Sequence, residues 1–67
     1  MTARDHASSE PGHLTRAELA LRWQLSGRTL DRWRAAGTGP AWLQLNGRIR
    51  YRLQDVHAFE RARLRQP

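Results

Sequence analysis

Two arginines that stand four positions apart, Arg28 and Arg32, are the residues of this sequence best suited to recognition chemistry. On a helix, residues at this spacing project from one face. A guanidinium group can donate a bidentate pair of hydrogen bonds to the O6 and N7 atoms of guanine. The pattern therefore predicts a helix that presents two such donors to the major groove of DNA. Taken alone, the same pattern is equally compatible with an ordinary solvated helix face.

Four residues around these arginines complete the first part of the candidate site. Ser26 and Thr29 lie at the expected start of the helix, where hydroxyl and backbone N–H groups commonly hold a phosphate. Gly27 lies between Ser26 and the arginines. Asp31 can accept a hydrogen bond from the amino group of cytosine or orient one of the two arginines, and we favour the orienting role.

A predicted β-hairpin supplies the second part of the site. Leu43 and Leu45 alternate before the Asn46-Gly47 pair, and Ile49 and Tyr51 alternate after it. A two-residue Asn-Gly turn would place Leu45 opposite an arginine and mix the two faces. A three-residue loop, residues 46–48, would keep one face apolar, so we prefer it. Under this register Trp42 lies on the outer face, and its role stays open.

The hairpin arginines are expected to touch DNA. Under the preferred register Arg48 lies at the loop tip, where a guanidinium can enter the narrow minor groove. Arg50 and Arg52 then lie on the outer face. The alternative is a basic edge strand that discourages aggregation.

Helix signals place these residues in a short architecture. Thr15 and Glu18 predict a capping box at the start of a helix over residues 16–23. Ser26 and Gly37 are suited to begin and end a second helix over residues 27–36. A third helix is expected over residues 53–64. We therefore predict a mainly α domain with a β-hairpin, a winged helix-turn-helix of order α-α-β-β-α, over residues 13–67, and a disordered tail over residues 1–12.

The expected core is small, and its members are the large apolar residues that fall on the inner faces of these elements. They are Leu14, Leu19, Trp23, Leu25, Leu30, Trp33, Leu43, Leu45, Ile49, Tyr51, Val56 and Phe59.

Composition narrows the class of partner. The chain has 67 residues, a formal net charge of +6 and no cysteine, and its twelve basic residues are all arginine. This excess favours a polyanionic partner. No catalytic triad, metal-ligand cluster or glycine-rich phosphate loop is evident, so we expect neither an enzyme nor a cofactor or metal. No apolar run is long enough to span a membrane, and the expected location is the cytoplasm.

Three segments, LSGRTLDRWR, GPAWLQLNGRIRYR and DVHAFE, occur in an order and spacing that resemble a known group. They are similar to the small winged helix-turn-helix proteins of the phage excisionase and AlpA-like regulator group, relatives of the MerR DNA-binding domain. The resemblance covers about three-quarters of the chain. It departs at Gln24, where family members often carry glycine, and in the short segment after Arg63.

The resemblance implies a bacterial or phage-borne, nucleoid-associated protein of a mobile genetic element. Arg28 and Arg32 would read the major groove and Arg48 would enter the minor groove of double-stranded DNA. The function implied is that of a recombination directionality factor, a transcription regulator, or both. Cooperative self-association on repeated sites and an integrase or recombinase partner are expected. A protein-interaction module, such as an antitoxin or inhibitor, is the alternative from another class.

Overall fold

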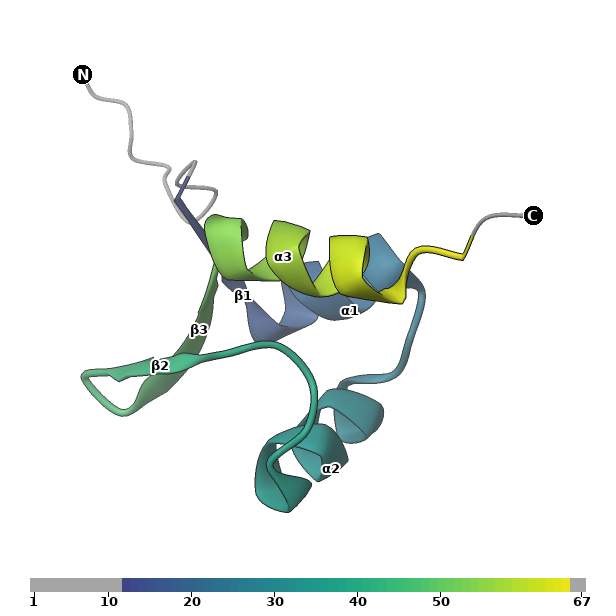
Figure 1. Ribbon diagram of the computed structural model, residues 1–67. Coiled ribbons are helices and arrows are strands. Elements are labelled where there is room, and N and C mark those ends of the chain that lie inside the picture. The colour runs from purple at the N-terminus through teal and green to yellow at the C-terminus, as the bar shows by residue number, and fades with distance from the viewer. Residues whose placement is uncertain (1–11, 66–67) are drawn as a thin grey trace.

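The computed structural model describes residues 12–65, which form three helices and a three-stranded antiparallel sheet of order β1-β3-β2 (Figure 1). The predicted tail lies outside the described residues except for Gly12. Along the chain the elements are β1 (His13–Thr15), α1 (Arg16–Trp23), α2 (Gly27–Ala36), β2 (Leu43–Leu45), β3 (Arg48–Arg52) and α3 (Leu53–Arg63).

The helices begin and end where local capping chemistry places them. The Thr15 hydroxyl accepts from the Glu18 backbone N–H, and the Glu18 carboxylate accepts from the Thr15 backbone N–H, so the predicted capping box is present. Ser26 caps α2, and Gly37 ends it in the left-handed conformation at φ 76°. The predicted bounds of α1 and α2 are confirmed, and α3 ends one residue earlier than predicted.

The turn between α1 and α2 depends on Gln24, which adopts the left-handed conformation at φ 56° and ψ 43°. The Leu25 N–H donates to the Ala20 carbonyl at 2.9 Å, and the Gln24 N–H donates to the Leu21 carbonyl at 3.2 Å. This pair of bonds is the Schellman arrangement, in which glycine is the usual left-handed residue. The chain therefore makes a short turn with glutamine in a position that favours glycine.

The hairpin contradicts the predicted register. Leu45 pairs with Arg48 and Leu43 pairs with Arg50, so the loop contains Asn46 and Gly47 alone. Both loop residues have positive φ, 51° and 79°, as a type I′ turn requires. The turn chemistry therefore prevails over the apolar alternation on which the three-residue loop was based.

This register also reverses the predicted faces of β2. Gln44 shares a face with Ile49, because directly paired residues of an antiparallel sheet lie on the same side. Trp42 directly precedes β2 and lies beside Leu30 and Tyr51, so it does not point to the outer face as predicted, although it is 42% exposed. Leu43 and Leu45 lie instead on the face of the hairpin arginines.

Strand β1 was not anticipated, and it makes the element order β-α-α-β-β-α. Its residue Leu14 pairs with Tyr51 of the central strand, and the Leu53 N–H donates to the Gly12 carbonyl at 2.9 Å. Three residues are too few for the alternation that identifies a strand in a sequence. β3 is therefore the central strand, paired with β1 on one side and with β2 on the other.

The core lies between the helices and the sheet. Leu19, Leu30, Tyr51 and Val56 are buried there, one from each of α1, α2, β3 and α3. Leu14, Ala20, Trp23, Trp33, Ile49 and Leu53 pack around them. Three predicted core residues are wrong, since Leu25 is 38% exposed, Leu45 is 50% exposed, and Leu43 lies on the arginine face outside the core.

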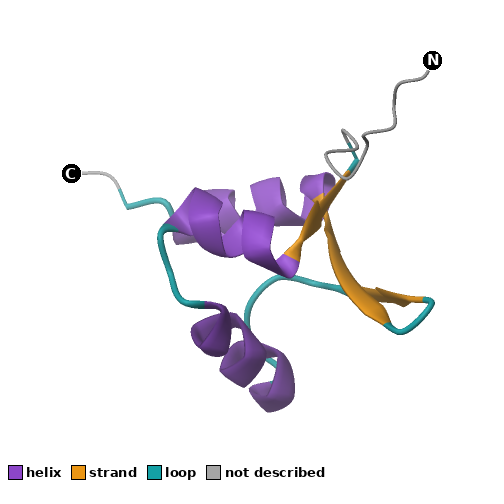
Figure 2. Cartoon of the chain, turned by 180° about the vertical axis from the view of Figure 1, so that it is seen from behind, coloured by secondary structure: helices purple, strands orange, loops and turns teal. Residues whose placement is uncertain are grey.

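The β2–β3 hairpin projects from one end of the helical body, and the C-terminal end of α3 lies at the other end (Figures 1 and 2). α2 follows α1 through the short turn and packs against it. None of the helices in the described residues has the length and apolar character needed to cross a membrane.

Candidate nucleic-acid interface

The outward side of α2 carries the two arginines that the spacing singled out. Arg28 and Arg32 are both exposed, while Leu30 on the opposite side is buried and Trp33 is partly buried. Within residues 12–65, neither arginine takes part in an ion pair. The helix therefore presents two uncommitted guanidinium groups, about one turn apart, to solvent.

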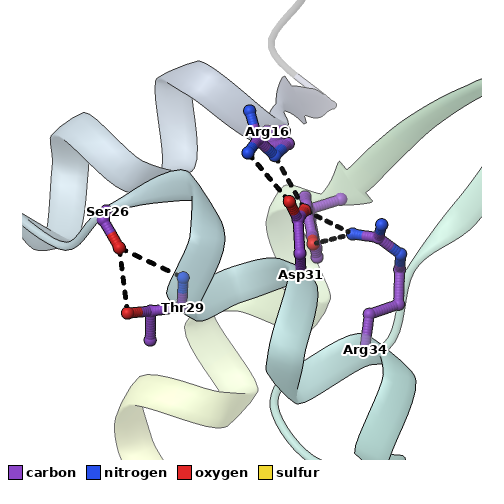
Figure 3. A network of polar contacts seen from close by, with 6 residues as sticks. Arg16, Ser26, Thr29, Asp31 and Arg34 are labelled. Carbon is purple, nitrogen blue, oxygen red and sulfur yellow. Dashed lines mark hydrogen bonds and ion pairs between the residues drawn. The ribbon is translucent and has the colours of Figure 1, made fainter.

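The hydroxyls at the start of α2 are occupied by the helix cap. The Ser26 hydroxyl accepts from the Thr29 backbone N–H at 3.1 Å and lies 3.0 Å from the Thr29 hydroxyl (Figure 3). These contacts satisfy one of the donors that a helix N-terminus leaves open. Both hydroxyls are therefore structural in the free chain and remain close to the exposed start of α2.

Asp31 orients two arginines, but not the two that were predicted. Its carboxylate accepts from Arg16 of α1 at 2.8 and 2.9 Å and from Arg34 at 3.3 Å (Figure 3). The hydrogen bond from Arg16 is the main cause that holds the pKa of Asp31 below its ordinary value. The expectation that Asp31 orients Arg28 or Arg32 is wrong, because its side chain points toward α1 and not along the outward face.

Gly27 allows this contact between α1 and α2. A Cβ atom at Gly27 would lie 2.5 Å from the guanidinium carbon of Arg16, which is closer than such atoms approach. The Arg16 side chain therefore crosses the first turn of α2 where glycine leaves room for it. The role of Gly27 in this structure is to admit Arg16, and sequence spacing gave no sign of that contact.

The hairpin arginines lie on one face of β3. Arg48 is exposed and pairs with Leu45, so it begins the strand next to the Asn46-Gly47 turn and does not form the loop tip. Arg50 is partly buried and donates to the Ile49 carbonyl at 2.8 Å. Arg52 pairs with Asp55 at 2.7 Å at the start of α3. Of the three, Arg48 has the most freedom to contact a ligand.

Arg34 connects α2 to the base of the hairpin. Its guanidinium lies 5.6 Å from the ring centre of Trp42 and 3.5 Å from the Tyr51 hydroxyl. Trp42 also lies beside Leu30 and Tyr51. The side chain left open in the sequence thus packs at the hairpin base, and the network Arg16–Asp31–Arg34 holds α1, α2 and the hairpin base together.

Comparison of the chain with protein-family models gave no match, and comparison with curated protein sequences gave no relative.

Proposed function

We propose that this chain is a sequence-specific double-stranded DNA-binding protein of the winged helix-turn-helix type. The observation that carries the proposal is the pair Arg28 and Arg32, exposed and free of ion pairs among the described residues, on a helix that follows a short turn. A recognition helix of this kind lies in the major groove with its N-terminal residues at the base edges. The net charge of +6 supports the same partner.

The spacing of the two arginines along α2 is close to the rise of two base-pair steps of the duplex. Four helical residues advance by about 6 Å, since each contributes about 1.5 Å. Two base-pair steps advance by about 6.8 Å, at about 3.4 Å each. Arg28 and Arg32 can therefore address different base pairs, each through a bidentate contact to guanine.

The hairpin is the proposed wing. Asn46 and Gly47 form a tight projecting turn, and Arg48 follows it on an exposed strand position. A guanidinium near such a turn can reach a narrow minor groove, where the negative potential is enhanced. Arg50 is the second wing residue, and its partial burial limits it to the flanking phosphate backbone.

The biological role that this surface supports is that of an excisionase-like factor of a mobile element, acting in recombination directionality, in transcription regulation, or in both. One module of this size buries roughly 600–1,000 Å² on DNA. Useful specificity then requires several copies side by side, so we propose cooperative binding to repeated sites, with an integrase or recombinase as the protein partner. The cytoplasm is the compartment in which such a protein works.

The test is enrichment of fragments from the genome that encodes the chain, followed by gel shift on the enriched fragment with random competitor DNA at physiological salt. Direct repeats beside an attachment site would support the recombination role, and an operator over a promoter would support the regulator. Equal retention of all fragments would contradict sequence-specific binding.

A further inference from the structure

A hollow of about 320 Å³ opens to solvent where α3 ends and α1 turns into α2. It is lined by Trp23, Leu25, Trp33, Phe59, Arg63 and Leu64, together with Glu60. Figures 1 and 2 show that this end of the molecule is opposite the hairpin. We call this feature the aromatic hollow.

The floor of the aromatic hollow consists of three rings in mutual contact. The ring centres of Trp23, Trp33 and Phe59 are separated by 5.4 to 6.3 Å. Side chains of this size contribute most when they are buried, yet all three are only partly buried here. Leu25 at 38% and Leu64 at 63% exposure extend the apolar surface beyond the rings. A contiguous exposed apolar surface of this kind marks a protein-interaction site more often than a solvated one.

The rim of the aromatic hollow is positively charged. The guanidinium of Arg63 lies 4.5 Å from the ring centre of Phe59. Arg63 is the arginine that lines the hollow, while Arg61 lines a neighbouring hollow that shares Glu60 and Leu64, and Arg65 follows the end of α3 by two residues. Within residues 12–65 none of these three arginines forms an ion pair. Glu60 does not offset them, because it already accepts from Arg22 at 2.7 Å and from the Trp23 indole N–H at 2.6 Å.

We propose that the aromatic hollow binds an acidic segment of a partner protein, one in which large apolar side chains are flanked by Asp or Glu. The apolar groups would cover the three rings, and the carboxylates would pair with Arg63 at the hollow and with Arg61 and Arg65 beside it. In the absence of DNA, charge selects this occupant over a second copy of the chain, because two free chains of net charge +6 repel each other, whereas the phosphates offset that charge when copies bind DNA side by side. A DNA duplex would not bind the floor of the hollow, since it would place charged phosphate groups against aromatic rings.

This site is separate from the proposed DNA surface. Arg28 and Arg32 lie on the outward side of α2, whereas Trp33 reaches the aromatic hollow from the inward side of the same helix. The chain can therefore hold a duplex and an acidic partner at the same time, as an adaptor between the two.

The test uses the full chain labelled with nitrogen-15 and a short synthetic peptide rich in Asp and Glu that carries two leucines and a phenylalanine. The indole N–H signals of Trp23 and Trp33 report on the hollow, and that of Trp42 serves as an internal reference. We expect saturable shifts of the first two signals and none of the third. Leu64→Asp and Arg63→Glu should each weaken binding by about tenfold or more. Leu21→Asp, at a leucine that is 79% exposed and outside the hollow, is the matched control and should not.

Three results would overturn the proposal. The first is the absence of any shift of the Trp23 and Trp33 indole signals at the highest peptide concentration of the titration. The second is an equal shift with a control peptide that keeps the carboxylates and replaces the apolar residues by serine. The third is sedimentation of the free chain as a dimer that Leu64→Asp converts to a monomer, which would assign the hollow to a second copy. Because none of these measurements contains DNA, their failure leaves the proposed DNA binding untouched.

Discussion

Replacing Gly27 by alanine should break the contact between Arg16 of α1 and Asp31 of α2 without changing the packing of the core. The added Cβ would lie 2.5 Å from the Arg16 guanidinium carbon, and that group is the far end of a flexible side chain. Arg16 therefore swings away, and its two hydrogen bonds to Asp31 at 2.8 and 2.9 Å are lost.

Two opposing contributions set the change that Gly27→Ala makes to the free energy of unfolding. The side chains of Arg16 and Asp31 are 46% and 40% exposed, and exposed pairs of this kind contribute about 0.2–1 kcal/mol. Gly27 is the first residue of α2, and replacing glycine by alanine at a helical position stabilises by about 0.4–1 kcal/mol because it restricts the unfolded chain. The two contributions nearly cancel in the native chain. In an Arg16→Ala background the loss of the ion pair is absent, so Gly27→Ala should stabilise by the full amount of about 0.4–1 kcal/mol.

The assay is a double-mutant cycle on urea unfolding of the four chains, supplemented by NMR titration of the Asp31 carboxyl carbon. We expect a coupling free energy of about 0.2–1 kcal/mol between positions 16 and 27. We also expect the pKa of Asp31 to rise toward its ordinary value in Gly27→Ala, because the hydrogen bond from Arg16 is what lowers it. Equal effects of Gly27→Ala in both backgrounds, with no change in the pKa of Asp31, would refute the reasoning.

Three further predictions concern stability. Gln24→Gly should raise the free energy of unfolding by roughly 0.5–1 kcal/mol, since relief of a left-handed Cβ penalty of about 1–2 kcal/mol exceeds the added freedom of the unfolded chain; no gain in the urea midpoint would count against it. Gly47→Ala should cost about 1–2 kcal/mol because φ there is 79°, and an unchanged midpoint would argue against the type I′ turn. The hydrogen bonds from Arg22 and then Trp23 lower the pKa of Glu60 to about 2, so its contribution is present above pH 4.5 and is lost as the pH falls toward 2. Glu60→Gln should flatten that part of the pH–stability curve, and an unchanged slope would assign the loss to other carboxylates.

The sequence carried enough information to predict the helices, because their ends are fixed by contacts within a few residues. Thr15 with Glu18 and Ser26 with Thr29 satisfy helix termini locally, and Gly37 supplies the left-handed end. Strand β1 was not predictable in this way, since its partners are at least thirty-five residues away and Thr15 also serves as a helix cap.

The hairpin register was wrong because two local rules disagreed. Alternation of apolar residues favoured Leu45 opposite Ile49, whereas an Asn-Gly pair favours a two-residue turn. The structure follows the turn, and Tyr51 and Ile49 then contribute to the core without the help of Leu43 and Leu45. An exposed hairpin end tolerates apolar side chains that a central strand would not.

The candidate site was predictable only where it depends on helical periodicity, and not where it depends on contacts between distant segments. The outward exposure of Arg28 and Arg32 follows from helical periodicity, and Leu30 is buried on the other side as expected. The partners of Asp31 could not be derived, since Arg16 lies fifteen residues away on another helix. The aromatic hollow was likewise hidden, because helical spacing alone places Trp23, Trp33 and Phe59 on inner faces and does not show that one side of the cluster is open.

The central claim, that Arg28 and Arg32 read base pairs, is tested most directly by measuring dissociation constants for the selected duplex and for random duplex over a range of salt. The double variant Arg28→Ala/Arg32→Ala is compared with Arg61→Ala/Arg65→Ala, which removes the same charge at the far end of α3. The account predicts that the first variant loses about 1–3 kcal/mol of discrimination per arginine, while the second keeps the discrimination and changes affinity little. Equal weakening by both variants on both duplexes would contradict it, because the arginines would then act through net charge alone.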